Sequence, residues 1–210
     1  MVVGVTGGIA TGKSAVVEQF RQLGAAVISA DELAREVVRP GEKTLARLVE
    51  RFGKDILQAD GTLDRKELGR LIFADPEARQ DLNRITHPAI ACLAAARIAS
   101  LQRQGALLII YEAPLLFEAG ADSRVDRIVV VTAPAEVQRQ RLMARDGLDE
   151  QAAQTRIEAQ MPLADKVKRA DFVVDNAGSV DALAAKVRAL YGRLLELARN
   201  RSAGPPETAG

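Results

Sequence analysis

The sequence predicts an α/β protein with a doubly wound, five-stranded parallel sheet. Three observations lead to this prediction: five short apolar runs, helical segments between them, and a glycine-rich loop directly after the first run. Strands that alternate with helices pair in parallel, because each connecting helix carries the chain back across the sheet. The five predicted strands are 2–6, 25–28, 106–111, 127–132 and 170–175.

The segments between these runs have the apolar spacing of amphipathic helices. The first runs from Lys13 to Leu23 and stops at Gly24, a residue type that often ends helices. In the longest segment, His87–Pro88 predicts a fresh turn or a kink, because proline lacks the N–H that a helix needs. The other predicted helices are 31–38, 43–52, 64–73, 76–104, one that starts at Pro134, 149–160 and 180–198.

The segment 38–105 separates the second strand from the third and is too long for a simple crossover. We interpret it as a helical substrate subdomain. The tail, 200–210, is small and polar with two adjacent prolines, and we expect it to be disordered. The rest is interpreted as a single domain, 1–199, with a core of 1–37, 106–134 and 170–199 and a helical lid over 135–169.

Composition restricts the function classes. The 210 residues carry a net charge of +1 and are 48% hydrophobic, so we expect a globular protein without a basic nucleic-acid-binding surface. No apolar run has the length of a membrane span. The single cysteine, Cys92, excludes an internal disulfide, and its apolar neighbours predict a buried thiol. We therefore expect a cytoplasmic protein with neither nucleic acid nor membrane as a partner, and composition leaves the oligomeric state open.

The glycine-rich loop after the first strand matches a phosphate-binding motif. Gly7, Gly12, Lys13 and Ser14 satisfy G-x-x-x-x-G-K-[ST], the P-loop. Glycines let successive backbone N–H groups turn toward phosphate oxygens, and the following helix dipole adds positive potential. Lys13 is expected on the β- and γ-phosphates of a nucleoside triphosphate, and the Ser14 hydroxyl on Mg²⁺. The fold is therefore predicted to be of the P-loop NTPase type, with a helical acceptor-binding insertion and a helical lid.

Candidates for the reaction itself lie beyond the carboxyl ends of the predicted strands, where ligands bind in such sheets. Asp31 follows the second strand and could accept a proton from an acceptor hydroxyl or cap the following helix. Arg141 and Arg145 are one helical turn apart and share a face. They could neutralise charge that develops on a transferred phosphoryl group, or they could form a solvated basic face.

Three further segments carry candidates. Residues 112–118 follow the third strand, at the same edge of the sheet, and the apolar side chains of 114–118 could belong to the core or form a wall against an apolar part of the acceptor. His87 could be a ligand, a base or a structural residue beside Pro88. Asn176 follows the last strand, at the edge of the sheet where the P-loop is expected.

Taken together, these residues resemble the dephospho-coenzyme A kinase family over about residues 1 to 199. Many families share the P-loop, but the ordered set of motifs is specific. The set consists of Thr6–Ile9, Ala30–Asp31 with Ala34–Arg35, Thr86–Pro88, Pro114–Glu118, Gln138 with Arg141, Arg145 and Asp146, and Asp175–Asn176.

The resemblance implies an activity: ATP-dependent phosphorylation of the ribose 3′-hydroxyl of dephospho-coenzyme A, the last step of coenzyme A synthesis, with Mg²⁺. It also implies roles, with Asp31 as the catalytic base and Lys13, Arg141 and Arg145 as catalytic partners. ATP would be bound by Gly8, Ile9, Ala10, Thr11, Gly12, Lys13, Ser14, Ala15 and Asn176, and the acceptor by Asp31, Arg35, His87, Leu115, Leu116, Phe117 and Glu118.

The sequence departs from the family at two places. Ser29 stands where the family often has Asp, and Ala10–Thr11 stand where it usually has small residues or Gly-Ser.

Two other functions fit a P-loop. One is a kinase for another small acceptor, such as a nucleoside monophosphate or shikimate, and the other is a GTP-binding switch. The switch needs an Asn-Lys-x-Asp guanine signature, and the sequence contains no Asn-Lys pair.

Overall fold

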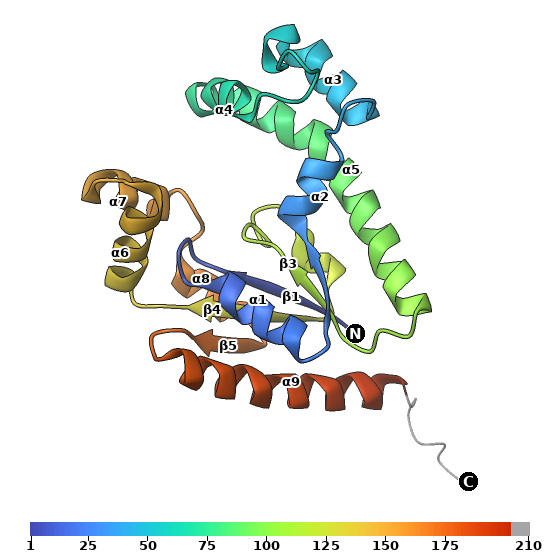
Figure 1. The fold of residues 1–210 in the computed structure, drawn as a ribbon, viewed down its shortest axis with the longest axis vertical. Coiled ribbons are helices and arrows are strands. Elements are labelled where there is room, and N and C mark those ends of the chain that lie inside the picture. Colours follow the sequence, from blue (N-terminus) through green and yellow to red (C-terminus); the bar gives the residue numbers. More distant parts are fainter. Residues whose placement is uncertain (203–210) are drawn as a thin grey trace. The chain divides into compact units, whose positions relative to one another are not determined.

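The computed structural model describes residues 1–202, apart from the side chains of Ala74 and Ser202 (Figure 1). Most of the tail that we expected to be disordered therefore lies outside the described residues. Its first residues, however, belong to a helix: the last helix of the chain, α9, spans Val180–Ser202.

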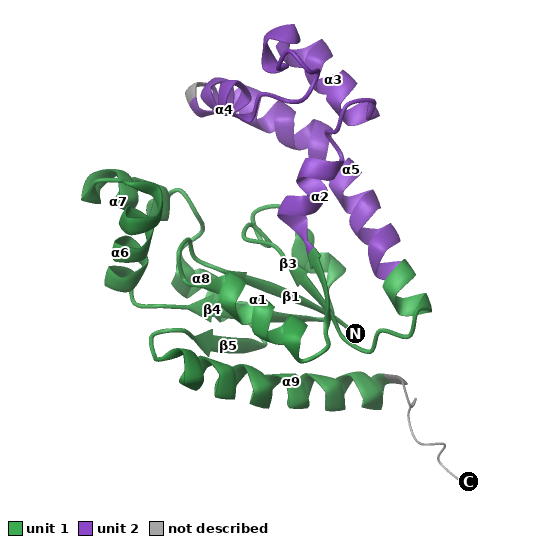
Figure 2. Cartoon of the chain, viewed as in Figure 1, with its two compact units in different colours: residues 1–28, 100–210 green, residues 29–99 purple. Residues whose placement is uncertain are grey.

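The chain divides into two compact units, which are coloured separately in Figure 2. One unit contains Met1–Ile28 and Ser100–Gly210, and the other contains Ser29–Ala99. The second unit thus begins at Ser29, earlier than the insertion that we predicted over 38–105, because the helix after the second strand groups with the other helices.

The first unit is built around a sheet with the strand order β2-β3-β1-β4-β5. Both neighbours of β1 are parallel to it, and β5 is parallel to β4, so the predicted doubly wound parallel sheet is confirmed. The register pairs Val5 with Glu112 and Gly7 with Val131, which brings the carboxyl ends of β1, β3 and β4 together. The strands are β1 Val2–Gly7, β2 Ala26–Ser29, β3 Ile109–Glu112, β4 Arg127–Thr132 and β5 Phe172–Asp175.

The helices agree with the predicted ones, with three short additions and one difference. The additions are α8 and the two 3₁₀ helices η1 and η2. The difference is α5, which continues through Pro88 as one helix, so the predicted fresh turn is wrong. In chain order the helices are α1 Lys13–Gln22, α2 Ala30–Glu36, α3 Lys43–Phe52, η1 Lys54–Ile56, α4 Arg65–Ala74, α5 Pro76–Arg103, η2 Ala121–Arg124, α6 Ala135–Asp146, α7 Glu150–Glu158, α8 Leu163–Lys168 and α9.

The two faces of the sheet are covered differently. On one face α1 and α9 lie together (Figure 1), and Phe20 of α1 packs against Tyr191 of α9 with ring centroids 6.4 Å apart. On the other face Gly4 of β1 leaves room for the segment after β3, since an added Cβ would lie 3.0 Å from Leu116 and 3.1 Å from Val125. The core over α1 and α9 consists of Val3, Val5, Val16, Val17, Phe20, Ala25, Leu108, Ile110, Val129, Val131, Val174, Leu183, Val187 and Leu194.

The second unit has an apolar core of its own, formed by helices α3, α4 and α5 with the residues that follow α2. Its fully buried members include Leu48 and Ile56. Cys92 of α5 is exposed, so the predicted buried thiol is wrong. Its apolar sequence neighbours point in other directions, since adjacent residues of a helix do not share a face. None of the helices in residues 1–202 combines the length and apolarity that a membrane crossing requires.

Candidate active site

The P-loop joins β1 to α1 and leaves the start of that helix open. Gly12 is the N-cap, with φ +82°, and no side chain of the described residues caps the helix. The first turn of α1 also contains no acidic residue. The N–H groups of Lys13 and Ser14 therefore begin a helix whose positive end is uncompensated, which favours an anion, while that of Ala15 donates to the carbonyl of Gly12 at 3.0 Å.

Contacts inside the loop fix its shape. Thr11 donates to the carbonyl of Gly8 through both its hydroxyl, at 2.9 Å, and its backbone N–H, at 3.4 Å. Ala10, between them, has φ +59°, a left-handed conformation that costs a residue with a Cβ about 1–2 kcal/mol. Ile9, beside Ala10, is half-buried. The loop thus stores strain at Ala10.

Neighbouring side chains leave no room for a Cβ at two glycines of the loop. A Cβ at Gly8 would lie 2.6 Å from Oε1 of Gln138, and one at Gly12 would lie 2.1 Å from Nδ2 of Asn176. Gln138 is buried and is held in turn by the carbonyl of Ala133, to which its amide donates at 2.9 Å. Side chains that follow β4 and β5 therefore hold the loop in place.

Asn176 and Arg141 hold the loop through hydrogen bonds to its backbone. The Asn176 amide donates to the carbonyl of Thr11 at 2.9 Å, and Nη1 of Arg141 approaches the same carbonyl at 3.4 Å. Nη2 of Arg141 lies 3.3 Å from the carbonyl of Asn176. The structure thus brings two sequence-predicted residues, from the last strand and from α6, directly onto the P-loop backbone.

Lys13 is held by an acidic side chain that our sequence-predicted site did not include. Its Nζ lies 2.5 Å from Oε1 of Glu112, the last residue of β3. Both side chains are largely buried, at 12% and 16% exposure. The pair forms because β3 lies next to β1 in the sheet. The order of strands along the sequence does not predict that these two strands are neighbours.

Arg145 is not brought to the P-loop in the same way as Arg141. Its guanidinium lies 2.8 Å from the carboxylate of Asp146, which also accepts from Arg156 of α7 at 2.7 Å. The hydrogen bond from Arg145, opposed by desolvation and helped by the charges of both arginines, lowers the pKa of Asp146. The same hydrogen bond raises the pKa of Arg145.

The segment after β3 combines both roles that its sequence left open. Leu116 and Phe117 are buried in the core, with 0% and 6% exposure, whereas Leu115 is 49% exposed. The Glu118 carboxylate accepts hydrogen bonds from the backbone of Met161, at 3.1 Å, and forms an ion pair with Lys166, at 2.8 Å. Only Leu115 therefore presents an apolar surface outward.

Asp31, Arg35 and His87 belong to the second unit. The N-cap of α2 is Ser29, whose hydroxyl accepts from the backbone of Glu32 at 3.4 Å, so the alternative that Asp31 is the cap is wrong. Asp31 is exposed in the first turn of α2 and Arg35 is exposed in its last turn. His87 is half-buried on α5.

Among residues 1–202, no group of three or more His, Cys, Asp or Glu side chains could hold a metal ion by itself. The Ser14 hydroxyl is exposed at the start of α1, and Glu112 ends the neighbouring strand. This sparse set fits Mg²⁺, which keeps several waters and binds through one or two protein oxygens together with substrate phosphates.

Comparison with known proteins identifies the family. The chain matches the dephospho-CoA kinase family over residues 1–182. It belongs to that family. A dephospho-CoA kinase from Syntrophotalea carbinolica is 57% identical over 195 residues, which cover 93% of this chain and 92% of the relative. One from Anaeromyxobacter dehalogenans is 50% identical over 193 residues, which cover 92% of each chain.

Solved structures agree. The dephospho-CoA kinase from Campylobacter jejuni is 30% identical, with a TM-score of 0.72 over 93% of this chain and 97% of that one. The protein TT1252 from Thermus thermophilus is 36% identical, with a TM-score of 0.78 over 92% and 97% of the two chains. The resemblance that the motifs indicated and the predicted fold class are thereby confirmed, and the chain is a P-loop kinase of the dephospho-CoA kinase family.

The structure also explains one departure from the family pattern. A carboxylate at position 29 would cap α2 as well as a hydroxyl does, so Ser29 preserves the capping function without the charge. Asp31 is then the acidic residue that this dephospho-CoA kinase family member carries next to the cap, accompanied by Glu32 in the same helical turn.

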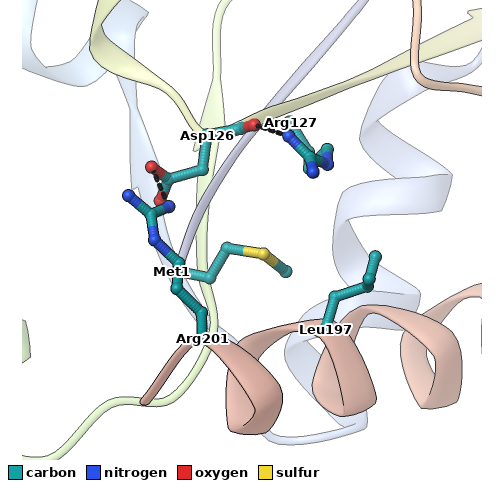
Figure 3. A pocket seen from close by; sticks show the side chains of 5 residues that line it. All are labelled: Met1, Asp126, Arg127, Leu197 and Arg201. Carbon is teal, nitrogen blue, oxygen red and sulfur yellow. Dashed lines mark hydrogen bonds and ion pairs between the residues drawn. The ribbon is translucent and has the colours of Figure 1, made fainter. Parts of the chain in front are cut away.

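A second cavity lies at the opposite end of β1 and has a different character. It has a volume of about 350 Å³ and is lined by Met1, Asp126, Arg127, Leu197 and Arg201 (Figure 3). Asp126 accepts from the backbone of Val2 at 2.8 Å and pairs with Arg201, and Arg127 pairs with Asp171 at 3.6 Å. Because Arg127 and Arg201 each have a carboxylate partner, this cavity lacks the open cationic character of the P-loop.

Proposed function

We propose that the chain transfers the γ-phosphoryl group of ATP to the ribose 3′-hydroxyl of dephospho-coenzyme A and releases coenzyme A and ADP. The observation that carries the proposal is the family match over residues 1–182 on a P-loop whose helix end is uncapped. Of the two substrates, the nucleotide is the one whose proposed binding site is best supported by the geometry.

ATP phosphates bind to the loop from Gly8 to Ala15 and to the Lys13 ammonium, through backbone N–H groups other than those of Thr11 and Ala15, which donate to the carbonyls of Gly8 and Gly12. Lys13 is already oriented by Glu112, so its side chain need not be ordered at the moment of binding. Asn176 and Arg141 keep the loop in shape through the carbonyl of Thr11. Adenine is expected beside Asn176, at the carboxyl end of β5.

Mg²⁺ is expected at the Ser14 hydroxyl, with the Glu112 carboxylate as the nearest acidic group of β3. The ion would neutralise charge on the β- and γ-phosphates. Together with Ser14, the Glu112 carboxylate would hold the hydrated ion through its water molecules.

The acceptor-binding residues are proposed from the resemblance to the dephospho-CoA kinase family. Asp31 accepts the proton of the 3′-hydroxyl, and its carboxylate is not needed as a helix cap because Ser29 has that function. The other acceptor-binding residues are Arg35, His87 and the segment Leu115, Leu116, Phe117 and Glu118. Leu115 is the residue of this segment with an apolar side chain exposed for contact.

Arg141 and Arg145 are proposed to stabilise the negative charge of the transferred phosphoryl group. Arg141 already lies against the P-loop. Arg145 has to leave Asp146 first, which assigns the conformational step of the lid to the α6–α7 region. We propose that the enzyme works in the cytoplasm on small molecules.

The test is ADP release by the purified chain with Mg²⁺ and ATP. Dephospho-coenzyme A should support turnover, and adenosine, nucleoside monophosphates and shikimate should not. Removal of Mg²⁺ with EDTA should stop the reaction, and its return should restore it. Preference for shikimate or a nucleoside monophosphate would make the chain a kinase for another acceptor.

A further inference from the structure

Lys166 of α8 is a buried charged residue that the proposed reaction does not use. Its side chain has 0% exposure, which is rare for lysine. Its Nζ lies 2.8 Å from Oε1 of Glu118 and 3.1 Å from the carbonyl of Pro114. Both acceptors belong to the segment after β3, at the two ends of the motif that contains Leu115.

The same two acceptors receive further hydrogen bonds. The Pro114 carbonyl also accepts from the hydroxyl of Thr6, at 3.1 Å, and Thr6 is the β1 residue before the first glycine of the P-loop. Glu118 also accepts from the backbone of Met161, where the chain enters α8. Lys166 is therefore the centre of a network that joins three segments: the end of β1, the loop after β3 and the start of α8.

An ion pair in this position contributes more to the orientation of the loop after β3 than to the stability of the fold. Replacement of a buried ion pair by apolar side chains is often neutral for folding, so stability alone does not call for a lysine here. What an apolar side chain cannot do is orient the Pro114 carbonyl and the Glu118 carboxylate. With both ends held, Leu115 is presented outward while Leu116 and Phe117 stay in the core.

We propose that Lys166 is a positioning residue for the acceptor: its ammonium fixes the loop Pro114–Glu118 and thereby the surface of Leu115. This inference rests on the proposed function, in which that loop binds dephospho-coenzyme A. Lys166 acts through the loop and does not touch the substrate. Glu118 then belongs to the acceptor-binding segment because it holds the loop as the partner of Lys166, and it acts on the acceptor through the loop.

Neighbouring residues of α8 provide a matched control. Lys168 lies two positions away on the same helix, its side chain is 75% exposed, and it pairs with Asp165 at 2.7 Å. Lys168→Met removes the same charge from the same helix without reaching the loop. This variant should leave both Michaelis constants and kcat unchanged.

The test compares steady-state kinetics of three variants with the unmodified chain. Lys166→Met leaves Glu118 without its cation and is expected to lower the melting temperature. The double variant Lys166→Met/Glu118→Leu replaces both partners by apolar residues and should fold normally. In the double variant KM for dephospho-coenzyme A should rise about tenfold or more, whereas KM for ATP should stay within about twofold.

A second readout separates this inference from the proposed function. Amide hydrogen exchange of residues 115–118 should be faster in the double variant than in the unmodified chain, and unchanged in Lys168→Met. A folded double variant with unchanged acceptor KM and unchanged exchange would overturn the inference. If the unmodified chain does not phosphorylate dephospho-coenzyme A, the proposed function fails, and exchange alone decides whether Lys166 orders the loop.

Discussion

Helices α1 and α2 each follow a strand of the sheet, and their first turns have opposite electrostatic character. Helix α1 begins at Lys13, has a glycine N-cap and contains no acid in its first turn. Helix α2 begins after the hydroxyl cap of Ser29 and carries Asp31 and Glu32 in its first turn. The connection through the P-loop thus provides an open cationic end, and the direct connection from β2 to α2 provides a compensated, acidic end.

The difference follows from what each end has to bind. An uncapped helix start attracts anions, and the phosphates of ATP are the anions that the P-loop fits. A capped start has no such need, and carboxylates in its first turn are stabilised by the dipole. One connection is therefore suited to the phosphoryl donor, and the other to a base. Substitutions at each end should separate these two roles.

The largest effect is expected at the open end. Lys13→Met should reduce kcat by about 10³-fold or more, because the ammonium stabilises charge on the transferred phosphoryl group. The chain should remain folded, since Lys13 contributes little to the apolar core, but its melting temperature should fall because Glu112 loses its cation. Turnover and a thermal melt on one preparation provide the check, and near-normal turnover would contradict the P-loop assignment.

A smaller loss is expected at the acidic end. Asp31→Asn should lower kcat by about 10²-fold, since the amide cannot accept the proton of the hydroxyl. The melting temperature and the Kd for ATP should not change, because Ser29 and not Asp31 caps α2. A drop in melting temperature with kcat intact would make Asp31 a structural residue.

The cap itself should affect only stability. Ser29→Ala should destabilise the protein by about 0.5–2 kcal/mol, the usual cost of losing an N-cap side chain. The 3.4 Å hydrogen bond is long, so a value near the lower limit is expected. Urea denaturation measures the loss, and kcat should stay within about twofold. A large decrease in kcat would show that the hydroxyl has a role beyond capping.

The smallest effect is expected from relief of strain in the P-loop. Ala10 has φ +59°, and glycine adopts this conformation without steric cost. Ala10→Gly should stabilise the folded chain by about 0.5–1 kcal/mol, because the relief exceeds the extra entropy of the unfolded glycine. A thermal melt with and without ATP measures this gain, and destabilisation would mean that the strain is absent.

The parts that the sequence predicted correctly are those encoded locally. The apolar runs predicted the strands, and the spacing from Gly7 to Ser14 predicted the P-loop, because both patterns are written in consecutive residues. Pro88 is the exception: α5 continues through a residue that usually ends or bends a helix. Packing of α5 in the second unit outweighed that local preference.

What could not be predicted depends on which strands are neighbours. Glu112 meets Lys13 because β3 lies beside β1, and Lys166 meets Glu118 because the short helix α8 lies against the loop after β3. An acid at the end of an apolar run was a usable signal for Glu112. No local pattern marks Lys166, because a single lysine in a short polar segment reads as a surface residue.

The central claim is that this chain phosphorylates the ribose 3′-hydroxyl of dephospho-coenzyme A. The most direct measurement is ³¹P NMR of the product formed from ATP, Mg²⁺ and dephospho-coenzyme A. We predict one new phosphomonoester on the ribose 3′-oxygen for each ADP released, with no product from the Lys13→Met chain. Release of ADP at the same rate without acceptor, or phosphate at any other position, would contradict the claim.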